Sequence, residues 1–272
     1  MFKSSDFAEY RSRLGFSSKK TFSDFMGAKD INPRIDFSYI ERLNERLEEI
    51  STKINGAYYK PCNLKSFLEQ KLYNTFNSIK AEGIMSMLNN QGRRKEDVYF
   101  SWMRGYLVCE YFREEISYIF GVQPNFVLNI GEDDFRSIQT FRRTPRADLQ
   151  IYDLLRVEVQ SGFQGANDIK ESKVREARNL FRDKYITTLI LHFDLFNGQV
   201  AYVDISRIED SDINWITRQQ MEGQSVFNID QNHFKWLLHK EPVELAKEIR
   251  ELVQAYGANT DKAPNVDHRI GN

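Results

Sequence analysis

Cysteine is scarce in this chain of 272 residues, which contains only Cys62 and Cys109. The two lie far apart and lack the close spacing of zinc ligands, so the sequence gives no sign of a cysteine-based metal site. One disulfide and two free thiols are both compatible with the sequence. We expect free thiols, as in most cytoplasmic proteins.

Long apolar runs are also missing. No segment approaches the roughly eighteen consecutive apolar residues of a membrane-spanning helix. The start of the chain, MFKSSDFAEYRSRLG, has no continuous apolar stretch of the kind found in a secretory signal. We therefore expect a cytoplasmic protein without a membrane partner.

A large excess of charge of either sign is absent as well. The chain has 38 basic and 39 acidic side chains, a net charge of −1. This balance argues against a protein that coats nucleic acid without specificity, but it allows a basic cleft balanced by an acidic surface. Glycine-rich phosphate loops and nucleophile elbows are absent, and the four histidines lack ligand spacing.

What the chain does have is enough apolar residues for a core, 41% of the total, in two kinds of period. Spacings of three and four predict helices, and alternation predicts strands. The expected helices are residues 36–54, 64–88, 96–120, 166–183 and 242–256. The expected strands are residues 125–130, 147–153, 155–161, 186–196 and 199–206.

A helix between the third and fourth strands requires a crossover, so the order predicts an α/β fold with a mixed sheet. We expect three regions. Residues 1–92 would form a helical N-terminal lobe, and residues 93–210 the α/β core. Residues 211–272 would form a helical extension packed on the core and ending in a polar tail.

Acidic residues interrupt the predicted hairpin PRADLQIYDLLRVEVQSG, residues 145–162. Because side chains alternate along a strand, Asp148 and Glu158 lie on polar faces that can meet. Two neighbouring carboxylates repel each other unless a cation lies between them, and such oxygen ligands suit Mg²⁺. The alternative is a solvent-facing sheet edge on which Arg156 neutralises both acids.

The motif and the element order together resemble the PD-(D/E)xK nuclease family. Pro145 precedes Asp148, and the triplet Glu158-Val159-Gln160 follows ten residues later, between two helices. Within the family, the chain resembles restriction endonucleases that carry Glu-x-Gln in place of Glu-x-Lys. The resemblance covers residues 96–206 and implies a restriction-endonuclease-like mixed sheet flanked by helices.

The resemblance also implies an activity, the Mg²⁺-dependent hydrolysis of phosphodiester bonds in double-stranded DNA, leaving 5′-phosphate ends. Asp148 and Glu158 would bind the metal together with the carbonyl of Val159. Gln160 would stand at the catalytic position of the usual lysine. A glutamate on the preceding helix often joins such sites. Glu110, Glu114 and Glu115 flank the apolar stripe of the predicted helix 96–120, and Glu110 is our candidate. The alternative is that all three are solvated surface glutamates.

A lysine from elsewhere is expected because Gln160 carries no charge and takes up no proton at neutral pH. Lys173, and after it Lys170, fall within the apolar arc of the predicted helix 166–183, near its start. Each is a candidate for the substitute lysine or for a phosphate contact. The alternative is a boundary lysine whose stem covers apolar surface while its ammonium reaches water.

Three basic segments would border this site, at residues 91–95, 141–146 and 170–184. Taken singly, each could be a solvated face, but together they predict phosphate contacts. The glycine-rich segment 160–165 would bring backbone close to DNA, and base edges could be read beside it. The candidate DNA-binding residues are Arg93, Arg94, Arg142, Arg143, Arg146, Gln164, Asn167 and Lys170.

The resemblance thus implies a type II restriction endonuclease of a prokaryotic cytoplasm, acting as a homodimer on a short palindromic site. The N-terminal lobe would serve dimerisation or DNA wrapping. A cognate DNA methyltransferase is expected as a genetic neighbour, not as a bound partner. The alternatives are a repair or recombination nuclease of the same fold and a non-catalytic DNA-binding module.

Overall fold

The computed structural model describes residues 3–28, 31, 34–88, 93–130, 148–218, 223–243, 245, 247–251 and 254. The chain forms two compact units, divided between Phe37 and Ser38. None of the helices within the described ranges combines the length and the apolar character that crossing a bilayer requires.

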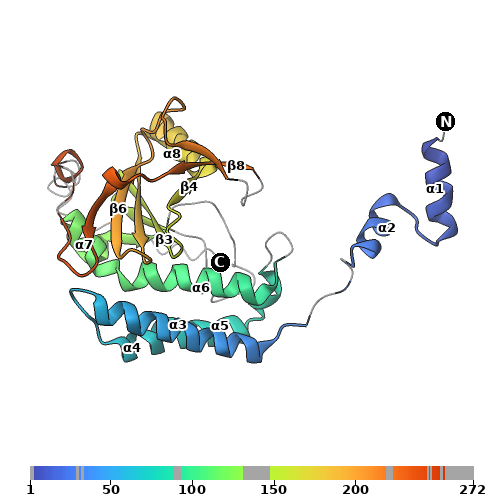
Figure 1. Ribbon diagram of the computed structural model, residues 1–272, viewed down its shortest axis with the longest axis horizontal. Coiled ribbons are helices and arrows are strands. Elements are labelled where there is room, and N and C mark those ends of the chain that lie inside the picture. The colour runs from blue at the N-terminus through green and yellow to red at the C-terminus, as the bar shows by residue number, and fades with distance from the viewer. Residues whose placement is uncertain are drawn as a thin grey trace, which may run out of the picture. The chain divides into compact units, whose positions relative to one another are not determined.

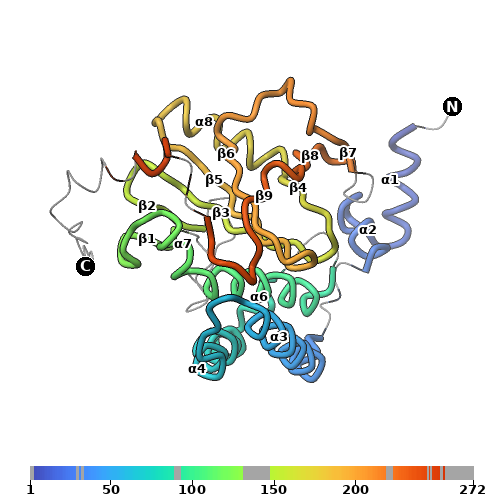
Figure 2. The backbone as a smooth tube through the Cα atoms, turned by 60° about the vertical axis from the view of Figure 1, so that its left-hand side comes forward, coloured from blue at the N-terminus to red at the C-terminus, as the bar shows by residue number. Residues whose placement is uncertain are grey.

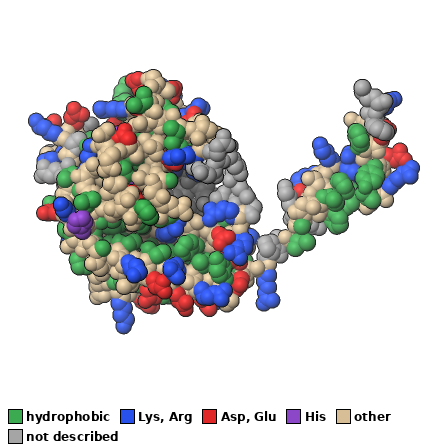
Figure 3. Space-filling view, viewed as in Figure 1, with side chains coloured by type: hydrophobic (Ala, Val, Ile, Leu, Met, Phe, Trp, Pro, Cys, Tyr) green, Lys and Arg blue, Asp and Glu red, His purple; other side chains and the backbone are tan. Residues whose placement is uncertain are grey.

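The first unit consists of two short helices, α1 (Ser4–Arg13) and α2 (Lys19–Met26). No residue of either helix is buried. Phe16 holds the pair together through ring contacts with Phe22 and Phe25, both at 5.1 Å between centroids. Apolar side chains remain exposed along this unit (Figure 3).

The second unit is built on a six-stranded sheet in the order β1-β2-β3-β5-β6-β9 (Figures 1 and 2). The strands are β1 (Val127–Asn129), β2 (Leu149–Ile151), β3 (Leu155–Gly162), β5 (Thr187–Asp194), β6 (Gln199–Asp204) and β9 (Phe234–Leu237). Strands β3 and β5 are parallel, and all other neighbours are antiparallel. The predicted mixed α/β sheet is therefore confirmed.

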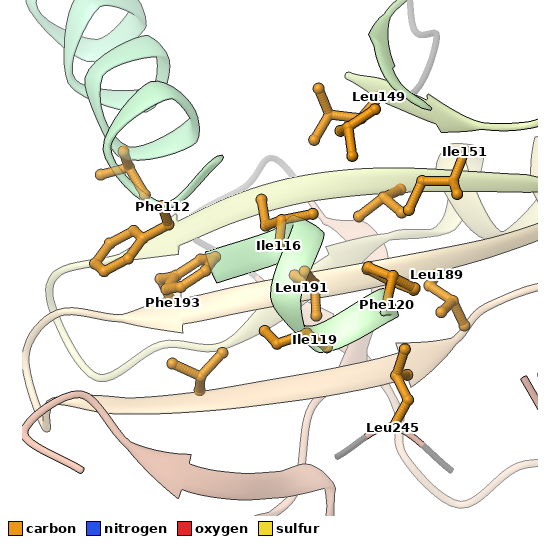
Figure 4. Close-up of a cluster of buried hydrophobic side chains, with 14 of the residues drawn as sticks. Phe112, Ile116, Ile119, Phe120, Leu149, Ile151, Leu189, Leu191, Phe193 and Leu245 are labelled. Atoms are coloured by element: carbon orange, nitrogen blue, oxygen red, sulfur yellow. The ribbon is translucent and has the colours of Figure 1, made fainter. Parts of the chain in front are cut away.

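Helices cover both faces of this sheet. On one face, α6 (Lys95–Tyr111) and α7 (Arg113–Phe120) pack on the apolar side chains that alternate along β2, β3 and β5 (Figure 4). On the other, α8 (Glu171–Lys184) packs through Val174 and Ala177 on Ile190 of β5. Because both faces are covered, every residue of β5 is buried, as expected of a central parallel strand.

The predicted helix over residues 96–120 is divided at Phe112, where the backbone turns to φ −92° and ψ 11°. The break lets the Phe112 ring stack on Phe193 of β5, with centroids 4.2 Å apart and planes at 11°. A continuous apolar stripe does not reveal such a bend, because both halves contribute to the same core.

A third helical layer lies on α6. It comprises α3 (Phe37–Ala57), α4 (Leu64–Leu68), a π-helical turn (Glu69–Tyr73) and α5 (Asn74–Ala81), followed by a 3-10 turn (Ile84–Met87). The buried hydroxyl of Tyr99 on α6 donates to Asn44 Oδ1 on α3 at 2.6 Å. The predicted lobe 1–92 is therefore divided, since only residues 1–37 are a separate unit.

A second, three-stranded sheet follows the order β4-β8-β7, with β4 (Asp168–Lys170), β7 (Trp215–Arg218) and β8 (Gln224–Asn228). No pattern in the sequence predicts this second sheet. The predicted helix over 166–183 begins only at Glu171, because 168–170 pair with β8. The helical extension predicted for 211–272 was wrong over β7, β8 and β9. Of its described residues, 247–251 and 254 are α-helical and Gln231–His233 form a 3-10 turn.

Candidate functional site

The two hairpin carboxylates lie opposite each other. Strands β2 and β3 pair with Leu149 opposite Val157, and extending this register by one residue sets Asp148 against Glu158, on the same face of the sheet. Asp148 Oδ2 also accepts a hydrogen bond from the backbone amide of Val159 at 2.8 Å. This bond fixes the Asp148 carboxylate against the strand that carries Glu158.

Lys173 completes this group from α8. Its ammonium forms an ion pair with Glu158 Oε1. The Glu158 side chain is 8% exposed and that of Lys173 is 24% exposed, so the pair lies at the edge of the protein interior. Burial lowers the pKa of Lys173, and the negative charges of Asp148 and Glu176 partly oppose that shift.

The substitute lysine that the sequence predicted therefore contacts the predicted carboxylate. Lys173 lies on α8 one turn before Ala177, which packs on the sheet, so burial of the helix's apolar face directs the lysine at β3. Lys170, the second candidate, is exposed at the residue before the helix. The structure brings Lys173 and not Lys170 to Glu158.

Gln160 lies two residues beyond Glu158 on β3 and therefore faces the same side. Its Oε1 atom is buried and has no hydrogen-bond partner. In the parallel pairing of β3 with β5, Gln160 is opposite His192, whose Nδ1 is also buried without a partner. Arg156 Nε and Thr188 Oγ1 on the same side are likewise buried without a partner, so the side of the sheet that carries Glu158 holds several polar atoms whose bonding capacity is unused.

Asn167 is buried and forms its hydrogen bonds within the protein. Its Oδ1 lies 2.7 Å from His192 Nε2, and its Nδ2 donates to Asp194 Oδ2 at 3.4 Å. Desolvation lowers the pKa of His192 to about 4, so this imidazole is neutral at physiological pH. Both ends of the Asn167 amide have partners inside the protein, which disfavours the base-reading role predicted for it.

Glu110 is not brought to the carboxylate pair. Its Oε2 pairs with Lys71 at 2.7 Å and its Oε1 with Arg113 at 2.9 Å. No three His, Cys, Asp or Glu side chains in the described part of the chain cluster closely enough to hold a metal ion. Both carboxylate oxygens of Glu110 are paired with cations, which disfavours the metal role predicted for it. The donor set around β3 is two carboxylates and the Val159 carbonyl, and such hard oxygen donors fit Mg²⁺.

The predicted DNA contacts divide into three groups. Arg142, Arg143 and Arg146 lie outside the described residues. Gln164 is exposed, as Lys170 is. The third group is Arg93 and Arg94 at the start of α6, whose guanidinium groups already bond to protein.

Arg93 and Arg94 are exposed, but their guanidinium groups have partners within the protein. Arg93 donates to Ser101 Oγ at 2.9 Å. Arg94 pairs with Asp97 at 3.1 Å and lies 4.8 Å from the centre of the Tyr39 ring. Phosphate contacts from either would therefore compete with intramolecular partners.

Arg104 joins this region to the glycine-rich segment, a link that the sequence analysis missed. Its guanidinium lies over the Phe163 ring at 3.0 Å from the centroid. Burial, together with the positive charge of Arg93, lowers the pKa of Arg104 to about 10. A guanidinium in the middle of α6 and a phenylalanine in a turn carry no local signal that would pair them in sequence.

Comparison with known proteins identifies no matching family model, no similar curated protein and no similar solved structure. The function of the site therefore has to be argued from its own geometry.

Proposed function

We propose that this protein is a Mg²⁺-dependent nuclease that hydrolyses phosphodiester bonds of double-stranded DNA. One observation carries the proposal: the ammonium of Lys173 pairs with Glu158, whose carboxylate lies opposite that of Asp148 across the β2–β3 hairpin. Two carboxylates and a partly buried cation at the edge of a sheet are the groups that metal-assisted phosphoryl chemistry uses.

The charges of the site suit a divalent cation and a phosphate together. Asp148 and Glu158 would hold Mg²⁺ with the carbonyl of Val159, since hard cations prefer oxygen ligands. When bound there, the metal would supply Lewis acidity and positive charge against the phosphate.

Lys173 is the second catalytic group of the proposed site, beside the metal. Its ammonium is placed to stabilise the negative charge that develops on the phosphate oxygens, which a positioned cation does best in a partly desolvated site. Desolvation also lowers its pKa, so its Nζ releases a proton more readily than an exposed lysine does. Gln160 would orient the substrate through hydrogen bonds, since its amide carries no charge.

The finer form of the proposal is a type II restriction endonuclease that acts as a homodimer on a short site in a prokaryotic cytoplasm. Lys170 and Gln164 are exposed and are our candidates for DNA contacts. We retain Arg142, Arg143 and Arg146 as proposals from sequence, because their segment directly precedes Asp148.

The test is incubation of supercoiled plasmid with the purified protein, with Mg²⁺ and with EDTA. Discrete fragments with Mg²⁺ alone support a site-specific nuclease. A smear, or cutting only of branched substrates, favours a repair nuclease, and binding without cutting favours a non-catalytic module.

Substitutions test which residues carry out DNA cleavage. We expect Asp148→Asn to reduce cleavage at least about a hundredfold while DNA binding in Ca²⁺ persists, because only the hydrolytic step loses its ligand. Lys173→Ala should reduce cleavage by about as much. The matched control is Lys170→Ala, which removes a neighbouring exposed lysine and should lower DNA affinity more than the cleavage rate. Full cleavage by Lys173→Ala would overturn its assigned role.

A further inference from the structure

A cavity of about 610 Å³ is lined by the segment that follows α3, by α4 and by residues at the junction of α6 and α7. Its volume falls within the range of about 300–1,000 Å³ typical of small-molecule sites. The proposed nuclease chemistry uses none of its residues.

Aromatic rings form one wall of the cavity. Tyr111 packs edge-on against Tyr58 and Phe67, both at 5.6 Å between centroids. Tyr59 packs edge-on against Tyr58 at 4.8 Å. The rings support one another and present a preformed surface, so a ligand would not have to order them.

The charge of the cavity wall is predominantly negative. Its charged residues are Lys60, Glu110, Glu114, Glu115 and Glu241. Glu110 is neutralised from outside the wall by Lys71 and Arg113. Three glutamates then remain against one lysine, which disfavours a nucleotide, a DNA phosphate or any other anion.

Glu115 is the most unusual of these glutamates. It is only 5% exposed. Its Oε1 accepts a hydrogen bond from Trp236 Nε1 at 3.3 Å, whereas its Oε2 is buried with no partner. Burial raises the pKa of Glu115 to about 7, and a buried carboxylate without a full set of bonds is costly unless a cation approaches it.

We propose that this cavity binds a small organic ammonium compound whose charged nitrogen pairs with Glu115 and whose apolar body lies against the tyrosine rings. An ammonium group supplies the positive charge and the donors that the glutamates lack. Tyrosine faces attract cations, by about 0.5–2 kcal/mol according to desolvation. A neutral compound of the same shape would gain only the apolar contacts.

The test uses three probes of one shape and different charge: 2-phenylethylammonium, 2-phenylethanol and phenylacetate. Their binding to the full chain is measured by isothermal titration calorimetry at pH 8, where Glu115 is deprotonated. We expect the ammonium probe to bind at least tenfold more tightly than the neutral probe, and phenylacetate not to bind.

Two variants test which glutamates supply the negative charge that attracts the ammonium probe. Glu115→Gln retains an acceptor for Trp236 but removes the buried charge, and it should weaken the ammonium probe at least tenfold. Glu241 is exposed, so Glu241→Gln changes the negative charge of the cavity wall without disturbing the fold. This variant should bind the ammonium probe severalfold more weakly. Glu82→Gln, an exposed change elsewhere, is the control and should bind as the unaltered protein does.

Equal affinity for the ammonium and neutral probes would overturn the proposal, as would no binding of the ammonium probe at millimolar concentration. Undiminished binding by a folded Glu115→Gln variant would overturn the role of that residue. Because plasmid cleavage is measured separately, failure here leaves the nuclease proposal intact, and the reverse also holds.

Discussion

Gly162 lies where β3 approaches the His192–Asn167 pair most closely. A Cβ atom at this position would come within 2.9 Å of His192 Nε2 and 3.0 Å of Asn167 Oδ1. Both groups are buried side chains held by hydrogen bonds, so neither can withdraw without leaving a polar atom unpaired. The glycine is needed for close packing, and its φ is not in the left-handed region.

We therefore expect Gly162→Ala to lower the free energy of unfolding by about 1–3 kcal/mol, through overpacking and a disturbed hydrogen bond. Urea unfolding followed by circular dichroism measures the loss. Gly105→Ala is the matched control, because no atom lies within 4 Å of a Cβ there and the residue is helical. It should be neutral or stabilising by up to about 1 kcal/mol. Equal stability of Gly162→Ala and the unaltered protein would contradict this explanation.

Glu115 makes stability depend on pH. Its folded-state pKa of about 7 is raised by burial above the ordinary value of 4.5. The stability associated with the neutral carboxyl is therefore fully present below about pH 4.5 and is lost as pH rises through 7. The shift corresponds to a loss on the order of 3 kcal/mol.

The variant Glu115→Gln should remove this dependence. We expect it to be as stable as the unaltered protein at pH 5 and more stable at pH 8, because the amide is never charged. Chemical unfolding at the two pH values measures the difference. A constant difference between the two proteins at both pH values would show that Glu115 does not titrate in this range.

The hairpin residues were the part of the site most accessible from sequence. Alternation alone placed Asp148 and Glu158 on one face, because a strand has a fixed period. The arc of α8 placed Lys173 among the candidates for the same reason. The sequence did not predict the partners of Asn167, Glu110 and Arg104. These partners, His192, Lys71 and Phe163, are distant in sequence, and no local pattern encodes such contacts.

At the scale of elements, the small sheet anchors the start of α8. Asp168 of β4 accepts two hydrogen bonds from Arg218 of β7, at 2.8 and 3.0 Å, and a third from Asn228 of β8 at 3.0 Å. Because Lys170 leads directly from β4 into α8, these contacts also set the position of Lys173.

Breaking this anchor should affect both stability and cleavage. Arg218→Ala leaves a largely buried Asp168 with one partner fewer, and we expect a loss of about 1–3 kcal/mol in unfolding free energy. If the protein is a nuclease, cleavage should fall more than DNA binding, because the lysine is displaced but the DNA surface is kept. Arg207→Ala, which removes the 3.4 Å ion pair with Asp204, is the surface control and should cost less than about 1 kcal/mol.

The sequence predicts some helices and strands better than others. The mixed sheet followed from a helix between two strands, a rule of topology that needs no knowledge of side-chain contacts. Strands β4, β7 and β8 are only three to five residues long, too short for periodicity to separate them from loops. β7 and β8 are neighbours in sequence, but β4 pairs with β8 across a long separation, with Asp168 opposite Asn228.

At the scale of the molecule, the first unit leaves apolar surface uncovered. Phe25 and Met26 of α2 are 57% and 68% exposed, and exposed apolar patches of this kind commonly mark an association surface. We expect the 32.1 kDa chain to be a dimer in solution that is held in part by this unit.

Light scattering coupled to size-exclusion chromatography tests this expectation. The unaltered protein should show about twice the chain mass, and the double variant Phe25→Asp, Met26→Asp should shift toward the monomer. Phe196→Asp, an equally exposed apolar position in the second unit, is the control and should remain dimeric. A monomeric unaltered protein would reject the dimer.

The anchoring of α8 by the small sheet also bears on the order in which the protein is synthesised. The hairpin with Asp148 and Glu158 leaves the ribosome well before β7 and β8, which hold Asp168 and with it the start of α8. A nascent or truncated chain that ends before residue 215 would contain both carboxylates and Lys173 but not the strands that fix the lysine in place. If the site cuts DNA, its activity is delayed until translation has passed Asn228, so incomplete products are inactive.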